Sequence, residues 1–440
     1  MSIFRLSSLV IPLLGAGVFL GAKVHADGAA DPVAANVEKA HAEVWRRFMD
    51  PYHLLLDSTE LDGKYDRPTP EECREGKPNA LAWWTPIENG AMFNGSYMEA
   101  ACLRWQQSKT EEDRVKARKV SQGLMLLASV SKVPGFIGRG VASDGKTPYP
   151  MGSNDQTSPW FYGLWRYADS GIPEAAERQQ IIGKMEEVAT ALEATGWLMP
   201  CNPPAPSPFR GDYSPFTWEG APRLLFLCKV MHHLTGKAKW DALYQKLLRE
   251  SGGNPAWTRL QLCEAGMHFD NEKHRQSWTG ASGVTVLRGL WELEQDPEVK
   301  AAYARGLAAS AAVAAPGLEM HAKFKVDAPQ KFHHDWRVLN QWWRPQHSEQ
   351  EAVDVAILQV KELGKLSPQR YQEHSFVREP CYAAWVVTLC PDTAVVTAHR
   401  DAIRAVLGHY KYDRLYYSQF FPVEAAWYRL RQLPAAEPKS

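Results

Sequence analysis

The sequence predicts an all-α protein in which six consecutive helical hairpins close into a single (α/α)6 toroid. Apolar helical segments alternate with amphipathic ones, which is the pattern of inner helices and their outer partners. Comparable points ahead of the first four inner helices, at Glu88, Asp155, Thr217 and Trp278, recur roughly every 60 to 70 residues. Alternating strand patterns are almost missing. In such a ring the loops that enter the inner helices meet at one mouth, where a ligand would lie.

The N-terminus has the three parts of a secretory signal peptide: the charge of Arg5, an apolar run at 9–22, and small residues up to Ala26. An uncleaved anchor is the alternative, but the apolar run is short for a membrane span of about 20 residues. We therefore expect a secreted or periplasmic protein with no membrane contact after cleavage. The predicted organisation is a signal peptide at 1–26, a flexible leader at 27–36, the toroid at 37–434 and a tail at 435–440.

The predicted helices follow from apolar periodicity, and proline and polar loops separate them. A helix at 37–49 precedes an irregular stretch at 50–83. Ser158 and Pro159 have the residue types of a helix N-cap and first turn, so the second inner helix is expected to start at Trp160. The six units are expected at 88–105 with 111–130, 160–168 with 173–195, 217–236 with 239–251, 279–295 with 297–315, 349–363, and 379–390 with 393–410, before a closing helix at 418–433.

Composition excludes several classes of partner. The chain has 50 basic and 50 acidic side chains, so its formal net charge of zero gives no reason to expect nucleic acid. The seven cysteines form no CxxC pair, and an odd number leaves at least one unpaired. The histidines form no HExxH motif, and adjacent His333 and His334 point in different directions. We predict no metal and no cofactor.

Polar and aromatic residues gather in the loops that feed the inner helices. Aromatic faces beside carboxylates suit a carbohydrate, and cleavage of a glycosidic bond commonly needs two carboxyl groups. Glu88 and Asp155 are the predicted catalytic pair, because each lies at the start of an inner helix. The positive end of the helix dipole there favours a base over a protonated acid, so only the environment decides the roles. Plain helix capping is the structural alternative.

Further residues of these loops are predicted to bind the substrate. Arginines among them, with Arg275 and Arg337, suit a uronate carboxylate because guanidinium pairs with it bidentately. The predicted substrate-binding residues are Trp84, Asn89, Arg139, Tyr149, Asn154, Trp160, Trp218, Glu219, Asp270, His274, Trp278, His334, Trp342 and Arg344.

Two stretches, WWTPIENGAMFNGSYMEAA and GSNDQTSPWFYGLWRYADSG, resemble the six-hairpin glycosidase superfamily, and within it the unsaturated glucuronyl and rhamnogalacturonyl hydrolases. The first is similar to the family's first inner helix. The second is similar to the segment that carries a catalytic aspartate, which places that role on Asp155. The resemblance implies an exo-acting enzyme that releases a terminal sugar from an oligosaccharide.

Two other functions fit the same pattern. A polysaccharide lyase on this fold would abstract a proton beside a uronate, with Tyr149, His268 or His334 as base. A non-catalytic glycan-binding protein would use the mouth only as a pocket. Absorbance from an unsaturated product distinguishes a lyase from a hydrolase, and binding without any product would identify the third class.

Overall fold

The computed structural model describes residues 31–268 and 276–433, and the chain from Pro32 onward forms one compact unit. This unit is a predominantly helical single domain with very little sheet, as the sequence predicted. The predicted signal peptide, the tail, Asp270 and His274 lie outside the described residues. Within the described residues, no helix combines the length and the apolar character that a membrane span needs.

Six helices of the described chain are buried along most of their length, and we call them the central helices. They are α3 (Gly90–Ser108), α5 (Asn154–Ala168), α7 (Gly220–Thr235), α10 (Ser277–Leu293), α14 (Glu379–Thr388) and α17 (Pro422–Arg431). Each central helix contacts the next one in this order, and α17 contacts α3.

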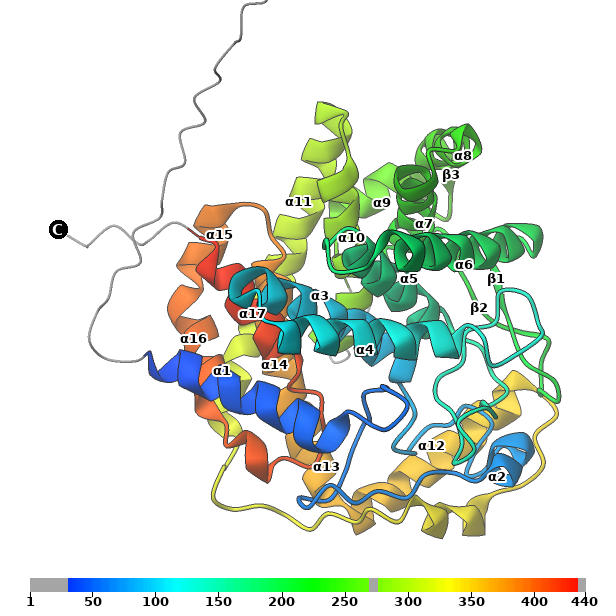
Figure 1. Ribbon diagram of the computed structural model, residues 1–440, viewed down its shortest axis with the longest axis vertical. Helices are drawn as coiled ribbons and strands as arrows, with labels where there is room; N and C mark the ends of the chain where they lie inside the picture. The colour runs from blue at the N-terminus through cyan, green and yellow to red at the C-terminus, as the bar shows by residue number, and fades with distance from the viewer. Residues whose placement is uncertain (1–30, 269–275, 434–440) are drawn as a thin grey trace, which may run out of the picture. The chain divides into compact units, whose positions relative to one another are not determined.

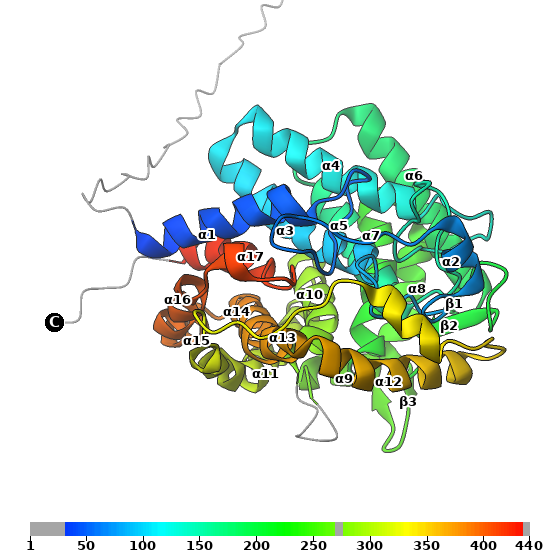
Figure 2. The ribbon, with the colours of Figure 1, turned by 90° about the horizontal axis from the view of Figure 1, so that it is seen from below.

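Each central helix also contacts a more exposed helix from elsewhere in the chain. These outer helices are α4 (Glu111–Leu127) on α3, α6 (Ala175–Ala194) on α5, α8 (Ala238–Arg249) on α7, α11 (Pro297–Ala314) on α10, α16 (Arg400–His409) on α14 and α1 (Pro32–Glu43) on α17. Figures 1 and 2 both show α1, near the start of the described chain, alongside α17 near its end.

The remaining segments are short or lie outside these pairs. The helices are α2 (Pro70–Glu75), α9 (Arg259–Ala265), α12 (Glu349–Leu366), α13 (Pro368–Glu373) and α15 (Thr393–Ala398). The π-helices are η1 (Val44–Phe48) and η5 (His374–Arg378). The 3-10 helices are η3 (Ala315–Lys323), η4 (Trp336–Trp342) and η6 (Tyr412–Arg414). Two antiparallel ribbons pair β1 (Leu198–Pro200) with β2 (Phe209–Asp212), and β3 (Ser251–Gly252) with β4 (Trp257–Thr258).

Helices α3 and α5 approach each other at glycines. A Cβ atom on Gly95 would lie 2.1 Å from the carbonyl oxygen of Pro159, and one on Gly163 would lie 2.7 Å from the Cα of Gly95. No side chain larger than hydrogen fits at such a crossing. Gly95, inside the first inner helix, therefore marks close helix packing.

The predicted start of the second inner helix was wrong. Helix α5 begins at Asn154, and the hydroxyl of Ser153, not of Ser158, accepts a hydrogen bond from the backbone N–H of Asp155 at 3.2 Å. Either serine satisfies the sequence rule for a cap. Pro159 consequently lies inside the helix, where its missing N–H leaves one carbonyl of the first turn without its helical partner. Asp155 is thus the second residue of the helix.

Three other expectations need correction. Helix α1 begins at Pro32, within the predicted flexible leader, because proline suits a first helical turn. Helix α2 lies within the stretch predicted to be irregular. The predicted fifth unit, α12, contacts α13 and η4 rather than the central helices. The closing helix α17 is central instead, since Pro422–Arg429 is buried on every side, whereas α12 buries one face only.

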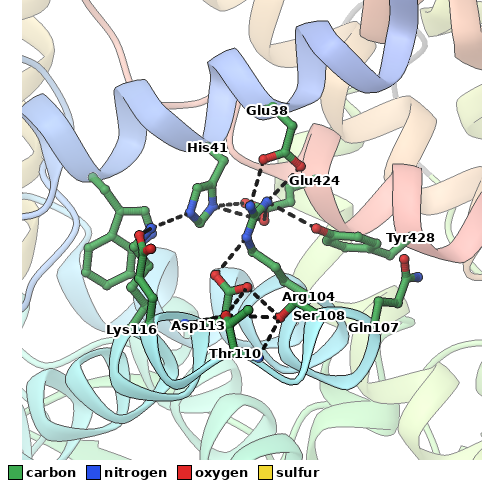
Figure 3. Close-up of polar contacts among 12 residues, drawn as sticks. Glu38, His41, Arg104, Gln107, Ser108, Thr110, Asp113, Lys116, Glu424 and Tyr428 are labelled. Atoms are coloured by element: carbon green, nitrogen blue, oxygen red, sulfur yellow. Dashed lines mark hydrogen bonds and ion pairs between the residues drawn. The ribbon is translucent and has the colours of Figure 1, made fainter. Parts of the chain in front are cut away.

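A polar network joins α1, α3, α4 and α17 (Figure 3). The guanidinium of Arg104 on α3 donates to Glu38 of α1 at 2.7 Å and to Asp113 of α4 at 2.9 Å. It also lies 3.4 Å from the buried carboxylate of Glu424 on α17, which in turn lies 3.0 Å from Nδ1 of His41. These contacts therefore link α1 to α17, the first and last helices of the described chain.

Candidate functional site

A cavity of about 580 Å³ brings together segments that are far apart in the sequence. Both predicted catalytic residues, Glu88 and Asp155, line it, although they come from the starts of different central helices. Five of the predicted binding residues also line it: Trp84, Asn89, Arg139, Trp278 and His334. Further lining residues come from 57–58, from 332–336, and from α12, α13 and η5.

Glu88 precedes the first central helix, since Asn89 is the N-cap residue and α3 begins at Gly90. Its Oε2 accepts a hydrogen bond from the backbone N–H of Trp84 at 2.7 Å, and its backbone carbonyl accepts one from Arg139 at 3.3 Å. Burial raises the pKa of the Glu88 carboxyl, although the Trp84 N–H and the charges of nearby arginines oppose that rise. The surroundings of Glu88 therefore favour the protonated acid.

Asp155 has different surroundings. It lies in the first turn of α5, and about half of its side chain is exposed, at 52%. Its Oδ1 lies 3.3 Å from Nη2 of Arg223, a buried guanidinium that also donates to the hydroxyl of Ser282 at 2.5 Å. The helix N-terminus and the arginine both stabilise a negative charge. Asp155 is thus suited to act as a carboxylate base.

A third acid, Asp57, lines the cavity and was missed from the sequence. Its two carboxyl oxygens accept hydrogen bonds from the backbone N–H and the side-chain amide of Asn89, at 2.9 and 2.7 Å. Burial, and then the charge of Glu88, raise the pKa of Asp57 well above its usual value. The sequence did contain one indication of this site, because Asp57 directly follows three consecutive leucines, 54–56. All three leucines are buried.

Two arginines that line the cavity, Arg370 and Arg378, were not among the predicted binding residues. Arg370 is on α13 and Arg378 ends the π-helical turn η5; π-helical turns often occur at functional sites. Among residues 31–268 and 276–433, neither guanidinium forms an ion pair with a carboxylate. Burial, and then the charge of Arg370, lower the pKa of Arg378 to about 9. A cavity wall with two cations that have no ion-pair partner in the described chain suits an anionic ligand.

Aromatic rings hold these arginines in place. The guanidinium of Arg378 lies 4.1 Å from the ring centre of Trp278, and that of Arg370 lies 4.6 Å from the ring of Trp84. Between them in the chain, burial and the two arginine charges lower the pKa of His374 well below its usual value, so its imidazole is neutral. Its Nε2 has no hydrogen-bond partner within the described chain.

Of the four arginines proposed from sequence for a uronate, only Arg139 is among the residues that line the cavity. Burial, and then the charge of Arg210, lower the pKa of Arg139 to about 10. Arg337 instead pairs with Glu72 at 2.7 Å, and Arg344 is exposed outside the cavity lining. Arg275 lies outside the described residues.

The other predicted binding residues that the structure describes are not part of the cavity lining. Tyr149 and Trp160 are fully buried, and they donate hydrogen bonds to the carbonyls of Lys77 and Leu124. Their apolar surroundings assign them to the core. Trp218 packs against His268, with ring centres 5.9 Å apart.

The remaining predictions are near the cavity or away from it. Asn154 begins α5, and its carbonyl accepts a hydrogen bond from Tyr213 at 3.2 Å. Glu219 lies 3.7 Å from Arg223, so it shares that guanidinium with Asp155 without lining the cavity. Trp342 ends η4 and also lies outside the lining.

The described part of the chain contains no group of three or more His, Cys, Asp or Glu residues placed to hold a metal ion. All seven cysteines are buried and free. No family model matches the chain, and no curated protein matches it at a significant level. The chemistry of the cavity therefore depends on its own residues: three acids in unlike surroundings, two arginines with no ion-pair partner in the described chain, a neutral imidazole and several aromatic rings.

Proposed function

We propose that the protein is an exported glycoside hydrolase that acts on an oligosaccharide and that its central and outer helices form an (α/α)6 toroid. The contacts that run from α3 through α17 and back to α3 support the ring. The contact of every central helix with one outer helix supports the hairpin arrangement, in which α1 is the outer partner of α17.

One observation carries the proposed reaction. Glu88 and Asp155 line the same cavity in unlike surroundings: burial raises the pKa of Glu88, whereas Asp155 is half exposed beside the guanidinium of Arg223. Two carboxyl groups in unlike environments are what acid and base catalysis of glycoside cleavage requires. We assign the role of general acid, which protonates the leaving-group oxygen, to Glu88. We assign the role of base or nucleophile to Asp155.

The rest of the cavity lining suits a sugar that carries a carboxylate. Trp84 and Trp278 offer aromatic faces, and Arg370 and Arg378 offer guanidinium groups with no ion-pair partner in the described chain. Sugar C–H faces stack on such rings, and a carboxylate pairs with guanidinium. The proposed substrate is a uronate-containing oligosaccharide.

Replacement of the two acids tests this assignment. Glu88→Gln and Asp155→Asn should each lower kcat on a uronate-containing oligosaccharide at least about a hundredfold, the usual contribution of acid or base catalysis. Asp62→Asn is the matched control, because Asp62 is an exposed acid that does not line the cavity. Turnover that survives both cavity substitutions would remove the pair from the mechanism.

A lyase is the second candidate, and one observation favours it. The neutral imidazole of His374, with a free Nε2, lies beside arginines that could neutralise a uronate carboxylate. Of the bases proposed from sequence for a lyase, Tyr149 is buried in the core, and His334 lines the cavity. An unsaturated product that absorbs in the ultraviolet would identify a lyase. Binding without any product would identify a glycan-binding protein.

A further inference from the structure

Asp57 is fixed in place by both its backbone and its side chain. Its backbone N–H donates to the carbonyl of Pro86 at 2.8 Å, and its carbonyl accepts from the N–H of Ser418 at 3.0 Å. Its carboxyl oxygens accept both donors of Asn89. Asp57 therefore cannot turn out of the cavity wall without loss of these bonds, and its exposed fraction is only 5%.

Glu88 is held close by, through the same short segment. Asn89, which binds Asp57 with both of its donors, directly follows Glu88 in the chain. The Glu88 carboxyl is in turn bound to the N–H of Trp84. Both carboxyls are therefore held in the wall of one cavity, where two ionised carboxylates repel each other.

We propose that Asp57 and Glu88 carry one proton between them at neutral pH, so that Asp57 is the positioning residue that keeps Glu88 supplied with a proton. This inference rests on the proposed function, in which Glu88 is the general acid. Burial raises the pKa of both carboxyls, and the charge of Glu88 raises the pKa of Asp57 further, as a shared proton requires.

The charges around the pair are compatible with one bound proton. The arginines of the cavity are Arg139, Arg370 and Arg378, and its acids are Asp57, Glu88 and Asp155. With one proton on the pair, the cavity wall carries three positive guanidinium charges and two negative carboxylate charges. One substrate carboxylate would neutralise the remaining positive charge. The other titratable groups that face the pair from neighbouring segments are His333, His334, His374, Tyr382 and Tyr417.

The proton balance of the reaction follows. Glu88 transfers the shared proton to the glycosidic oxygen as the bond from that oxygen to the anomeric carbon breaks. A water molecule attacks the anomeric carbon and loses its proton to Asp155. The pair is then fully ionised, and it regains one proton from solvent as Asp155 releases the one it took. No other reactant is needed.

A carboxyl titration that needs no substrate tests the pair. Carbon-13 NMR of protein labelled at Asp side-chain carboxyls would follow Asp57, which is assigned by the loss of its signal in Asp57→Asn. In the wild type we expect the Asp57 signal to reach its fully ionised position only above neutral pH, because the shared proton is on Asp57 for part of the time. In Glu88→Gln its midpoint should fall by about one pH unit or more, because the neighbouring charge is gone. An Asp57 that is ionised at acidic pH in the wild type, or whose midpoint is unchanged in Glu88→Gln, overturns the proposal.

The pH profile of hydrolysis provides the second readout. In Asp57→Asn the alkaline limb of kcat should move to lower pH, because Glu88 then loses its proton without a charged neighbour. Asp62→Asn, the same change at an exposed site, should leave the limb in place. A purely structural role for Asp57 would lower activity without moving the limb. If the two carboxyls titrate as a pair but the protein hydrolyses no substrate, the shared proton stands and the proposed hydrolase function is wrong.

Discussion

The acidic residues of this cavity have unlike surroundings, because different segments of the chain supply their neighbours. Glu88 is held among a backbone N–H, a second acid and the cavity wall, whereas Asp155 is half exposed beside Arg223 at a helix start. The helix dipole alone predicted a base at both positions. Burial outweighs the dipole at Glu88, because the residue lies just before the helix rather than inside its first turn.

Arg378 provides a prediction that separates binding from stability. Arg378→Gln should weaken binding of a uronate oligosaccharide roughly 10- to 100-fold, the value of a charge-assisted hydrogen bond. The same change should raise the thermal unfolding midpoint, since it removes a desolvated charge that has no ion-pair partner in the described chain. Calorimetry with and without the oligosaccharide measures both effects.

Arg344→Gln is the control for that experiment, because Arg344 is exposed and lies outside the cavity lining. It should change neither affinity nor unfolding temperature. Equal affinities for wild type and Arg378→Gln would contradict the role of the arginine in anion binding.

Glu373 gives a prediction for the pH dependence of stability. Burial raises its pKa from the usual 4.5 to about 7, although it accepts hydrogen bonds from Gln369 and from the backbone of Tyr416 and Tyr417. The folded state therefore binds more protons than the unfolded state between these values. The contribution of Glu373 to the free energy of unfolding is fully present below about pH 4.5. It is lost as the pH rises to about 7, and the loss amounts to up to about 3 kcal/mol.

Urea unfolding at about pH 5 and about pH 8 measures this loss. The variant Glu373→Gln should show a correspondingly flatter dependence on pH, because it has no carboxyl to titrate. The same pH dependence in the variant and the wild type would contradict a raised pKa in the folded protein.

The sequence identified some site residues and missed others for physical reasons. Glu88 and Asp155 were found because a helix start is visible as a change of pattern. Asp57 follows a stretch with no period, and Arg378 lies on a π-helical turn that interrupts the 3.6-residue repeat. Tyr149 and Trp160 were predicted to bind substrate, but residue type cannot distinguish a ring in the core from one in a cavity.

At the scale of elements, the α3–α5 crossing depends on glycine. Gly95→Ala should lower the free energy of unfolding by about 3 kcal/mol, because the new methyl group would meet the carbonyl oxygen of Pro159 and force the two backbones apart. Chemical denaturation measures the change. Gly183→Ala in α6 is the matched control, because a methyl group there would meet no neighbouring group within 4 Å.

The control should stabilise the protein by up to about 1 kcal/mol, since alanine is the better helix former. A Gly95→Ala protein as stable as the wild type would show that the two helices can separate freely. Such an outcome would contradict the close crossing that fixes the start of α5, and with it Asp155, relative to α3.

Element types were more predictable than element partners. The outer helix α4 was located from its amphipathic pattern, which does not depend on the neighbour it covers. Helix α12 has the same kind of pattern, yet it packs on α13 and η4. An amphipathic pattern predicts that one face of a helix is buried, but it does not specify which element packs against that face.

At the scale of the whole chain, Arg104 connects the first and last described helices (Figure 3). Arg104→Ala should lower the free energy of unfolding by about 3 kcal/mol, because it leaves the buried carboxylate of Glu424 and the carboxylate of Asp113 without this cation. Arg114→Ala, at a more exposed pair with Glu174, should cost no more than about 1 kcal/mol.

Denaturant unfolding of the two variants compares these costs. Equal losses would mean that the network contributes no more than a surface ion pair. The sequence predicted a predominantly helical single domain, but it did not predict that α1 would pack on α17. Contacts between residues some 380 positions apart, such as His41 with Glu424, leave no local pattern in the chain.

The central claim is that two acids in one cavity hydrolyse a glycosidic bond. Its most direct test is mass spectrometry of the products after incubation of a uronate-terminated oligosaccharide with the wild-type protein in heavy-oxygen water. The expected result is a released terminal sugar that carries one heavy oxygen atom, with no such product from Glu88→Gln or Asp155→Asn. An unsaturated sugar without the heavy atom, or an intact oligosaccharide, would contradict the claim.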